Sequence, residues 1–436
     1  MRRDIGSWNR VPAVVHARAW ALADRSAALP ELADGETGLA YGNGRSYGDV
    51  CLNPDGDLFF TRGLDKFIAF DRATGALECE AGVMLSEILD LVAPMGWFPA
   101  VTPGTRFVTV GGAIANDVHG KNHHVAGSFG HHVASFELLR SDGSRLVCSP
   151  EENANMFAAT IGGLGLTGVI TTARLQLARI ANPFMVVEAR RFRSLDEFWD
   201  LNARAEREWP YTVSWIDCTA PRGRGLLLCG AHAPAQGPLP AFSERGLAVP
   251  LDPPISLINP LSLKAFNFAY FHKPTPRGKT LQHYAPYFYP LDAIREWNRI
   301  YGRKGFYQYQ CVLPPAAARA GVAEMLAAIS ASGAGSFLAV LKTFGARPSL
   351  GMLSFPRPGA TLALDFPNHG EATESLFARL DAIVSEAGGA LYPAKDARMS
   401  PEMFAASFPR AEEFSRYVDP KFSSGFWRRV HAEEPI

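Results

Sequence analysis

Residues 35–180 are dense in glycine, and short apolar runs alternate there with turn signals. Short apolar runs bounded by glycine, asparagine or aspartate are typical of strands. The pattern predicts three strands over 56–85, a helix over 85–96, a hairpin over 131–149, a short helix over 152–162 and a long strand over 168–180. This irregular order excludes a regular βαβ array and predicts a mixed α+β domain.

Two glycine-rich segments stand about 60 residues apart in this region. Gly42–Asp49 has three glycines in seven residues, so that backbone N–H groups can converge on an anion beside the positive charge of Arg45. No Lys-Ser/Thr pair follows, which excludes a Walker loop. The small residues Pro103–Thr105 and Gly111–Asn116 permit close approach of a flat ligand or of another backbone. Together the segments favour a dinucleotide site, with tight structural packing as the alternative.

Gly163–Gly168 matches the spacing GxGxxG. A helix is predicted before it and a strand after it, which reverses the order of the Rossmann fingerprint. The motif therefore does not indicate a Rossmann fold.

At about residue 182 the glycine-rich pattern of short apolar runs ends, and longer predicted strands and helices follow. Strands are predicted within 185–192, 211–220, 306–314, 336–345 and 361–367, and helices within 193–210, 315–333 and 369–389. This order predicts a second α+β domain whose sheet is covered on one side. Residues 234–290 hold eleven of the 32 prolines, a density that predicts an irregular segment without long helices.

Several polar side chains are candidates for a site. Five of the eleven histidines fall between His119 and His132, and a metal site, structural histidines and a polar active-site loop are all open interpretations. Lys342 lies among apolar residues and must find a partner or a cavity. Gln308 and Gln310 project from one face of their strand, which lines either a pocket or an exposed sheet face.

Composition narrows the class of protein. The 436 residues carry 43 basic and 43 acidic side chains, which excludes a globally basic nucleic-acid binder. The six cysteines are scattered, as is typical of reduced thiols. No run approaches the roughly 18 apolar residues that span a bilayer. We expect a soluble cytoplasmic protein of two domains, at most peripheral to the inner membrane.

Three segments resemble the FAD domain of the vanillyl-alcohol-oxidase / p-cresol-methylhydroxylase (PCMH) family: GNGRSYGD, PGTRFVTVGGAIANDVHGKNHHVAGSFGHHV and IGGLGLTGVI. The likeness continues through FYQYQCVLP, SFLAVLKTFG and LYPAKDAR. It implies an α+β, two-domain fold. A PCMH-type FAD-binding domain would span 1–181, a substrate domain on an antiparallel sheet 182–389, and a segment returning to the FAD domain 390–436.

The resemblance implies non-covalent FAD with its pyrophosphate on the 42–48 loop. The residues implied to hold it are Gly42, Asn43, Gly44, Arg45, Ser46, Tyr47, Gly104, Thr105, Gly111, Gly112, Ala113, Asn116, His119, Gly120, Asn122, Gly168, Ile170, Tyr392 and Lys395. The residues implied to hold the substrate are Lys121, Ser214, Gln308, Gln310, Lys342, Thr361 and Ala363. No metal ion is implied.

The catalytic groups implied by the resemblance are Lys395, His119 and Tyr47. Oxidation of a hydroxyl requires a base for its proton and a hydride acceptor, which the flavin provides. Lys395 would either stabilise the reduced flavin as a cation or accept the proton as a neutral amine. His119 and Tyr47 are alternative proton acceptors, and the sequence does not choose among the three.

Two positions depart from mycobacterial members of the family. Ala363 replaces a cysteine, and Thr361 replaces an asparagine. Oxidation needs no thiol, so the first change is compatible with activity. The second alters expected contacts to a sugar phosphate.

The branch of the family with this likeness oxidises the 2′-hydroxyl of a polyprenyl-phosphate-linked ribose. That reaction is the first half of an epimerisation to arabinose for cell-wall biosynthesis. The resemblance thus implies a lipid-linked sugar phosphate as substrate and a separate NAD(P)H-dependent short-chain ketoreductase as partner. Residues 234–290 would form walls over the pocket and a peripheral membrane contact, with an ordinary irregular connection as the alternative. The alternative function is a soluble aldonolactone or alditol oxidase acting on free sugars.

Overall fold

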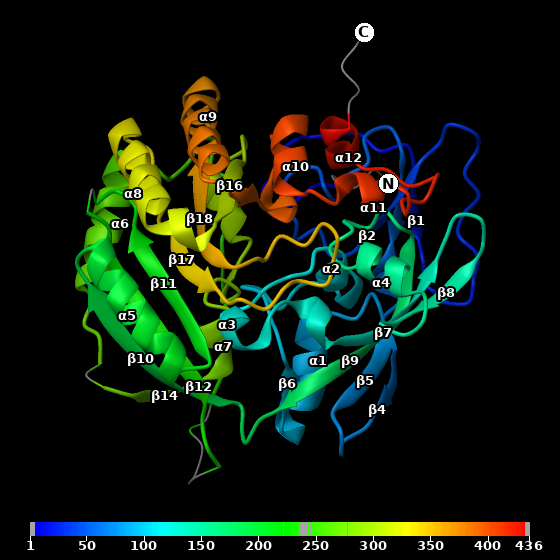
Figure 1. The fold of residues 1–436 in the computed structure, drawn as a ribbon, viewed down its shortest axis with the longest axis horizontal. Helices are drawn as coiled ribbons and strands as arrows, with labels where there is room; N and C mark the ends of the chain where they lie inside the picture. Colours follow the sequence, from blue (N-terminus) through cyan, green and yellow to red (C-terminus); the bar gives the residue numbers. More distant parts are fainter. Residues whose placement is uncertain are drawn as a thin grey trace.

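The computed structural model describes residues 5–220, 222–235, 240, 242–243, 246–276 and 278–431. Two sheet-based bodies lie side by side, and the C-terminal helices return over the N-terminal body (Figure 1). Among the described residues, no helix has the length and apolar character needed to cross a bilayer.

The N-terminal body contains two sheets, which confirms the predicted mixed α+β order. The smaller is parallel, in the order β1 (Ala19–Ala21), β3 (Asp57–Phe60) and β2 (Gly38–Tyr41). The larger is antiparallel, in the order β4 (Phe67–Phe70), β5 (Ala76–Glu80), β9 (Val169–Arg179), β7 (Val133–Leu139) and β8 (Arg145–Cys148), with β6 (Trp97–Pro99) also on β9. The helices here are α1 (Leu85–Val92), α2 (Val110–Ala115), α3 (His123–Ala126) and α4 (Ala154–Thr160).

The Gly163–Gly168 motif lies between α4 and β9, in the helix-then-strand order that the sequence predicted. Gly168 has φ +135°, and a Cβ there would meet the Leu139 carbonyl oxygen at 2.6 Å. The glycine is therefore required for close packing of the backbone onto β7.

The second body is built on an antiparallel sheet of eight strands, as expected. Their order is β14 (Thr280–His283), β10 (Phe184–Phe192), β12 (Arg224–His232), β11 (Tyr211–Asp217), β17 (Val340–Phe344), β18 (Gly359–Pro367), β16 (Phe306–Leu313) and β19 (Ala390–Leu391). The helices α5 (Leu195–Glu208), α8 (Pro315–Ser332) and α9 (Glu371–Glu386) lie together on one side of this sheet (Figure 1).

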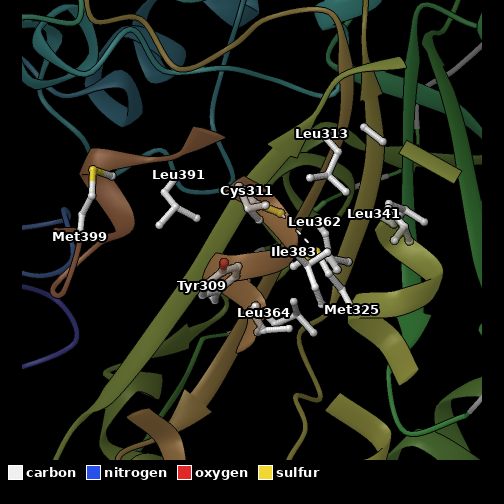
Figure 2. Close-up of a cluster of buried hydrophobic side chains, with 14 of the residues drawn as sticks. Tyr309, Cys311, Leu313, Met325, Leu341, Leu362, Leu364, Ile383, Leu391 and Met399 are labelled. Atoms are coloured by element: carbon white, nitrogen blue, oxygen red, sulfur yellow. Dashed lines mark hydrogen bonds between the residues drawn. The ribbon is translucent and has the colours of Figure 1, made fainter. Parts of the chain in front are cut away.

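Alternate residues of the strands form the core beneath these helices. Tyr309, Cys311 and Leu313 of β16 share a buried cluster with Leu341, Leu362, Leu364, Met325 of α8 and Ile383 of α9 (Figure 2). Because side chains alternate between the two faces of a strand, the residues between them face away from the helices. The opposite face of the sheet is thereby left for a site.

The prediction that residues 234–290 contain no long helix is wrong. The helix α6 spans Pro260–His272, with Asn259 as its N-cap and Pro260 in its first turn. The prolines stand on either side of this stretch, and a proline at the first helical position is compatible with a helix. Positions 236–239, 241, 244, 245 and 277 of this segment lie outside the described residues.

The C-terminal chain connects the two bodies. It adds β19 to the edge of the large sheet and then forms α10 (Pro401–Ser407), α11 (Ala411–Ser415) and α12 (Gly425–Val430). The N–H of Gly38 in β2 donates to the Lys421 carbonyl at 2.7 Å, and that of Gly425 donates to the Leu52 carbonyl at 2.8 Å. The last segment therefore packs on the first strands of the protein.

Candidate active site

A cavity of about 1400 Å³ lies between the N-terminal body and the face of the large sheet opposite α5, α8 and α9. Single small-molecule pockets usually occupy about 300–1,000 Å³, so this cavity has room for more than one ligand. Its lining combines the glycine-rich loops with polar residues of the sheet.

The 42–48 loop forms one wall. Within the described part of the chain, nothing accepts a hydrogen bond from the N–H groups of residues 43–46. Gly48 has φ +64°, and a Cβ there would come within 1.7 Å of the Asp396 carbonyl oxygen. Arg45 places its guanidinium 4.0 Å from the Trp8 ring centroid, and its buried Nε has no partner among the described residues. The loop thus offers N–H donors and a positive charge to an anion.

The second glycine-rich segment lies beside this loop, because Asn43 donates from Nδ2 to the Phe107 carbonyl at 2.7 Å. Gly104, Thr105, Gly111, Gly112 and Asn116 contribute to the lining, as do Gly120, Gly168 and Ile170. Asn116 donates from Nδ2 to the Gly112 carbonyl at 2.8 Å, whereas its buried Oδ1 has no partner in the described structure. The small residues and this free acceptor suit a flat heteroaromatic ring with N–H donors.

Two residues implied for the cofactor do not line the cavity. The Ala113 side chain is buried in the core of the N-terminal body. Asn122 donates from Nδ2 to the Ala100 carbonyl at 2.8 Å. Both side chains therefore pack within the protein behind the residues that line the cavity.

Polar residues cover the cavity side of strands β16, β17 and β18. The cavity is lined by Gln308, Gln310, Lys342, Thr361 and Ala363. Of the two alternatives that the sequence leaves open, Gln308 and Gln310 therefore line a pocket rather than an exposed sheet face. Asp365 lies on the same face and is buried, and its Oδ1 accepts a hydrogen bond from Gln308 Nε2 at 2.5 Å.

The sequence analysis missed Asp365 as a site residue. The two-residue spacing of 361, 363 and 365 in the predicted strand could have placed them together. The register pairs Gln308 with Asp365 and Gln310 with Ala363. That pairing brings the carboxylate to the cavity.

His119 is held at both ring nitrogens. Lys342 Nζ lies 2.8 Å from His119 Nδ1 and also donates to the Gly120 carbonyl at 2.7 Å. Gln310 Nε2 lies 3.0 Å from His119 Nε2. Burial, and then the charge of Lys342, hold the pKa of His119 well below its usual value. His119 is therefore a neutral, fixed group at physiological pH.

The other four histidines of the cluster have partners within the protein. His123 Nδ1 accepts from the Gly345 N–H, and His124 Nε2 lies 3.0 Å from the Trp209 carbonyl. His131 and His132 contact Ser128 and the Ala126 carbonyl. Among the described residues, no group of three or more metal-ligating side chains is arranged around a common point.

Lys395 lies with its Nζ 3.9 Å from the Tyr47 ring centroid. Burial lowers the pKa of Lys395 to about 8, while the Asp365 carboxylate acts in the opposite direction. Burial raises the pKa of Asp365 to about 7 and that of Tyr47 well above its ordinary value. Of these groups, Lys395 and Asp365 change protonation nearest to neutral pH.

Two further lysines bring positive charge to the cavity. Lys121 Nζ donates to the Tyr287 carbonyl and lies 4.5 Å from the ring centroid of that tyrosine. Burial lowers the pKa of both Lys121 and Lys342 to about 7. An anionic ligand beside these amines would favour their charged forms.

Ser214 reaches the cavity wall, but its side chain lies on the other face of the sheet. It pairs in register with Leu227 and Leu341, which belong to the core under the helices. Its hydroxyl is buried and has no partner among the described residues. Tyr392, in contrast, lines the cavity and donates from its hydroxyl to the Asn116 carbonyl at 2.9 Å.

Comparison with known proteins identifies the class to which this fold and site belong. The FAD binding domain family matches residues 28–149. The chain is 36% identical over 410 residues to decaprenylphosphoryl-beta-D-ribose oxidase of Mycolicibacterium smegmatis, covering 90% of this chain and 88% of that protein. It is 34% identical to an uncharacterized protein of Streptomyces coelicolor, over 80% of this chain and 100% of the relative. It is also 30% identical to L-gulonolactone oxidase of Mus musculus, over 31% of this chain and 30% of that enzyme.

The fold and site are those of a flavoprotein oxidoreductase with a PCMH-type FAD-binding domain. The chain belongs to the vanillyl-alcohol-oxidase / p-cresol-methylhydroxylase family of FAD-dependent enzymes. The residues present fit this cofactor. Among the described residues, the N–H groups of residues 43–46 and the Arg45 Nε have no acceptor and suit a pyrophosphate, and the Asn116 Oδ1 has no donor and suits a flavin N–H.

Proposed function

We propose that this enzyme oxidises the 2′-hydroxyl of a polyprenyl-phosphate-linked ribose to the 2′-keto sugar. The observation that carries the proposal is the polar sheet face, where Gln308, Gln310, Lys342 and Asp365 face the glycine-rich wall across one cavity. Amide and carboxylate groups suit sugar hydroxyls, and the lysines suit a phosphate. The name of the mycobacterial relative supports the choice of sugar.

The proposal assigns FAD to the 1–181 body, completed by the 390–436 segment, and the sugar to the 182–389 body. The pyrophosphate would rest on residues 42–48, with the ring near Gly112, Asn116 and Tyr392. The flavin would be non-covalent, because both ring nitrogens of His119 are already engaged. When bound, FAD supplies an acceptor for the hydride that leaves the carbinol carbon.

Lys395 accepts the hydroxyl proton in this proposal. Its lowered pKa leaves a useful fraction of neutral amine near neutral pH. His119 is occupied by Lys342 and Gln310, and the raised pKa of Tyr47 keeps it a phenol. The Asp365 carboxylate stabilises the ammonium that forms on Lys395.

Lys121 and Lys342 are assigned to the phosphate, with Gln308, Gln310 and Thr361 on the sugar. Gln310 Nε2 donates to Thr361 Oγ1 at 3.2 Å, so the threonine belongs to the same hydrogen-bonded group of polar side chains as Gln310. Ala363 leaves space beside Gln310 where a larger side chain would contact the sugar.

Oxidation alone does not invert the 2′ centre. A separate NAD(P)H-dependent ketoreductase would return a hydride to the other face of the keto sugar, completing an epimerisation.

We also propose a peripheral contact with the inner membrane from the cytoplasm. It is supported by strongly exposed apolar side chains around α6, namely Leu247, Leu251, Ile255, Leu261 and Phe268.

The test is flavin reduction by the purified holoenzyme under anaerobic conditions. Lipid-linked ribose should bleach the flavin absorbance, and free alditols or aldonolactones should not. Lys395→Ala should slow the bleaching by about 10²–10⁴-fold. Bleaching by free alditols with no response to the lipid-linked sugar would favour an alditol oxidase instead. A near-wild-type rate in Lys395→Ala would remove this lysine from the mechanism.

A further inference from the structure

The cavity face of the large sheet changes from polar to apolar along one continuous row of residues. The register pairs Gln310 with Ala363, Ala363 with Val340, Val340 with Trp215 and Trp215 with Leu226. All five line the cavity. The row therefore runs from the glutamine beside His119 to a fully apolar floor.

A second row extends the apolar floor. Val213 pairs with Leu228, and Leu228 pairs with Ala189. These three side chains line the cavity and are only half-buried, so they are open to a ligand. Phe266 and Tyr270 of α6 form a wall above this floor, with the Tyr270 and Trp215 ring centroids 4.7 Å apart.

Two lysines, Lys342 and Lys121, lie at the boundary between the polar and the apolar half of the cavity. Lys342 shares a strand face with Val340, two residues away. Lys121 lies beside β11, because the Thr212 N–H donates to its carbonyl at 2.9 Å. A ligand with a polar head, a central phosphate and an apolar tail matches this order of surfaces.

We infer that the apolar half of the cavity, floored by Ala189, Val213, Trp215, Leu226 and Leu228, binds the isoprenoid chain of the substrate. The inference rests on the proposed function, because it assigns the sugar to the polar half and the phosphate to Lys121 and Lys342. It places the first part of the chain inside the protein rather than in the membrane.

The test measures binding of prenyl phosphates to the holoenzyme by calorimetry, without turnover. Farnesyl phosphate should bind about 100-fold more tightly than dimethylallyl phosphate, because each additional buried methylene adds apolar contact. Ala189→Trp fills the floor and should reduce that ratio below about tenfold, leaving dimethylallyl phosphate within about threefold of wild type. Leu228→Glu places a charge on the same floor and should act in the same direction if Ala189→Trp does not fold.

The matched control is Val147→Glu, because Val147 is 47% exposed on β8 and does not line the cavity. Its binding ratio should equal that of the wild type. Equal affinities for the two prenyl phosphates in the wild type, or an unchanged ratio in folded Ala189→Trp and Leu228→Glu, would overturn the inference. Chain-length-dependent binding without flavin reduction by lipid-linked ribose would instead remove the proposed reaction and leave the apolar site.

Discussion

Replacing Asp365 with asparagine tests the proton acceptor directly. The amide oxygen can still accept the hydrogen bond that Gln308 Nε2 now donates to Asp365 Oδ1 at 2.5 Å. The substitution therefore removes the negative charge with little change in shape. Because that charge opposes the effect of burial on Lys395, the pKa of Lys395 should fall from about 8.

The structure bounds the size of this fall. No Lys395–Asp365 ion pair within 4.0 Å occurs among the described residues, so the two charges are not in contact. At 4 Å and an effective dielectric constant of 20, their attraction would be about 4 kcal/mol, or roughly three pKa units. At a larger separation we expect a fall of about one to two units.

The assay is the rate constant of anaerobic flavin reduction by lipid-linked ribose over about pH 5.5–9.5. If neutral Lys395 accepts the proton, the rate constant rises with pH through the pKa of this lysine. The midpoint of the rise should lie about one to two pH units lower in Asp365→Asn than in the wild type.

Two results would refute this reasoning. An unchanged midpoint in Asp365→Asn would mean that the carboxylate does not act on the proton acceptor. A rate constant that falls, rather than rises, with pH would mean that Lys395 is required as an ammonium.

Three further substitutions test separate parts of the structure. Gly48→Ala, whose Cβ would clash with the Asp396 carbonyl at φ +64°, should lower FAD affinity by about tenfold or more in flavin titrations of the apoprotein. Undiminished affinity would show that the loop tolerates a side chain. Arg429→Met removes the cation held 2.7 Å from Asp49 and 3.2 Å from Asp396, and the loss of about 3–5 kcal/mol should lower Tm by about 3–5 °C in differential scanning fluorimetry. No change in Tm would mean that these carboxylates are already solvated. Ser214→Ala should leave KM within about twofold of wild type, because this hydroxyl faces the helix-covered core. A tenfold rise in KM would instead place it on the substrate.

Much of the fold was readable from periodicity and turn residues. The hairpin over 131–149, the reversed context of Gly163–Gly168 and the shared face of Gln308 and Gln310 all follow from local spacing. A lysine among apolar residues requires a partner or a cavity, and Lys342 contacts His119 and the Gly120 carbonyl. These inferences need only neighbours along the chain.

The rest depended on register between distant strands, which no local pattern specifies. Asp365 enters the cavity because β18 pairs with β16 in the register that sets it opposite Gln308. Ser214 leaves the cavity face because it pairs with Leu227. The prediction that 234–290 contains no long helix was wrong because it counted prolines without regard to their positions. The prolines lie at the start of α6 and outside it, so they do not interrupt the helix.

The return of the C-terminal chain to β2 has a consequence for the order in which the protein is made. The Tyr47 N–H donates to the Ala394 carbonyl at 2.9 Å, and Gly38 is bonded to Lys421. The 42–48 loop leaves the ribosome early, yet its contacts are completed only when these late residues emerge. Two early segments of the N-terminal body, at Gly38 and Tyr47, are therefore completed by residues that are synthesised late. Only a nascent chain translated beyond Ala394 can supply the 42–48 loop with its hydrogen bond from the Tyr47 N–H.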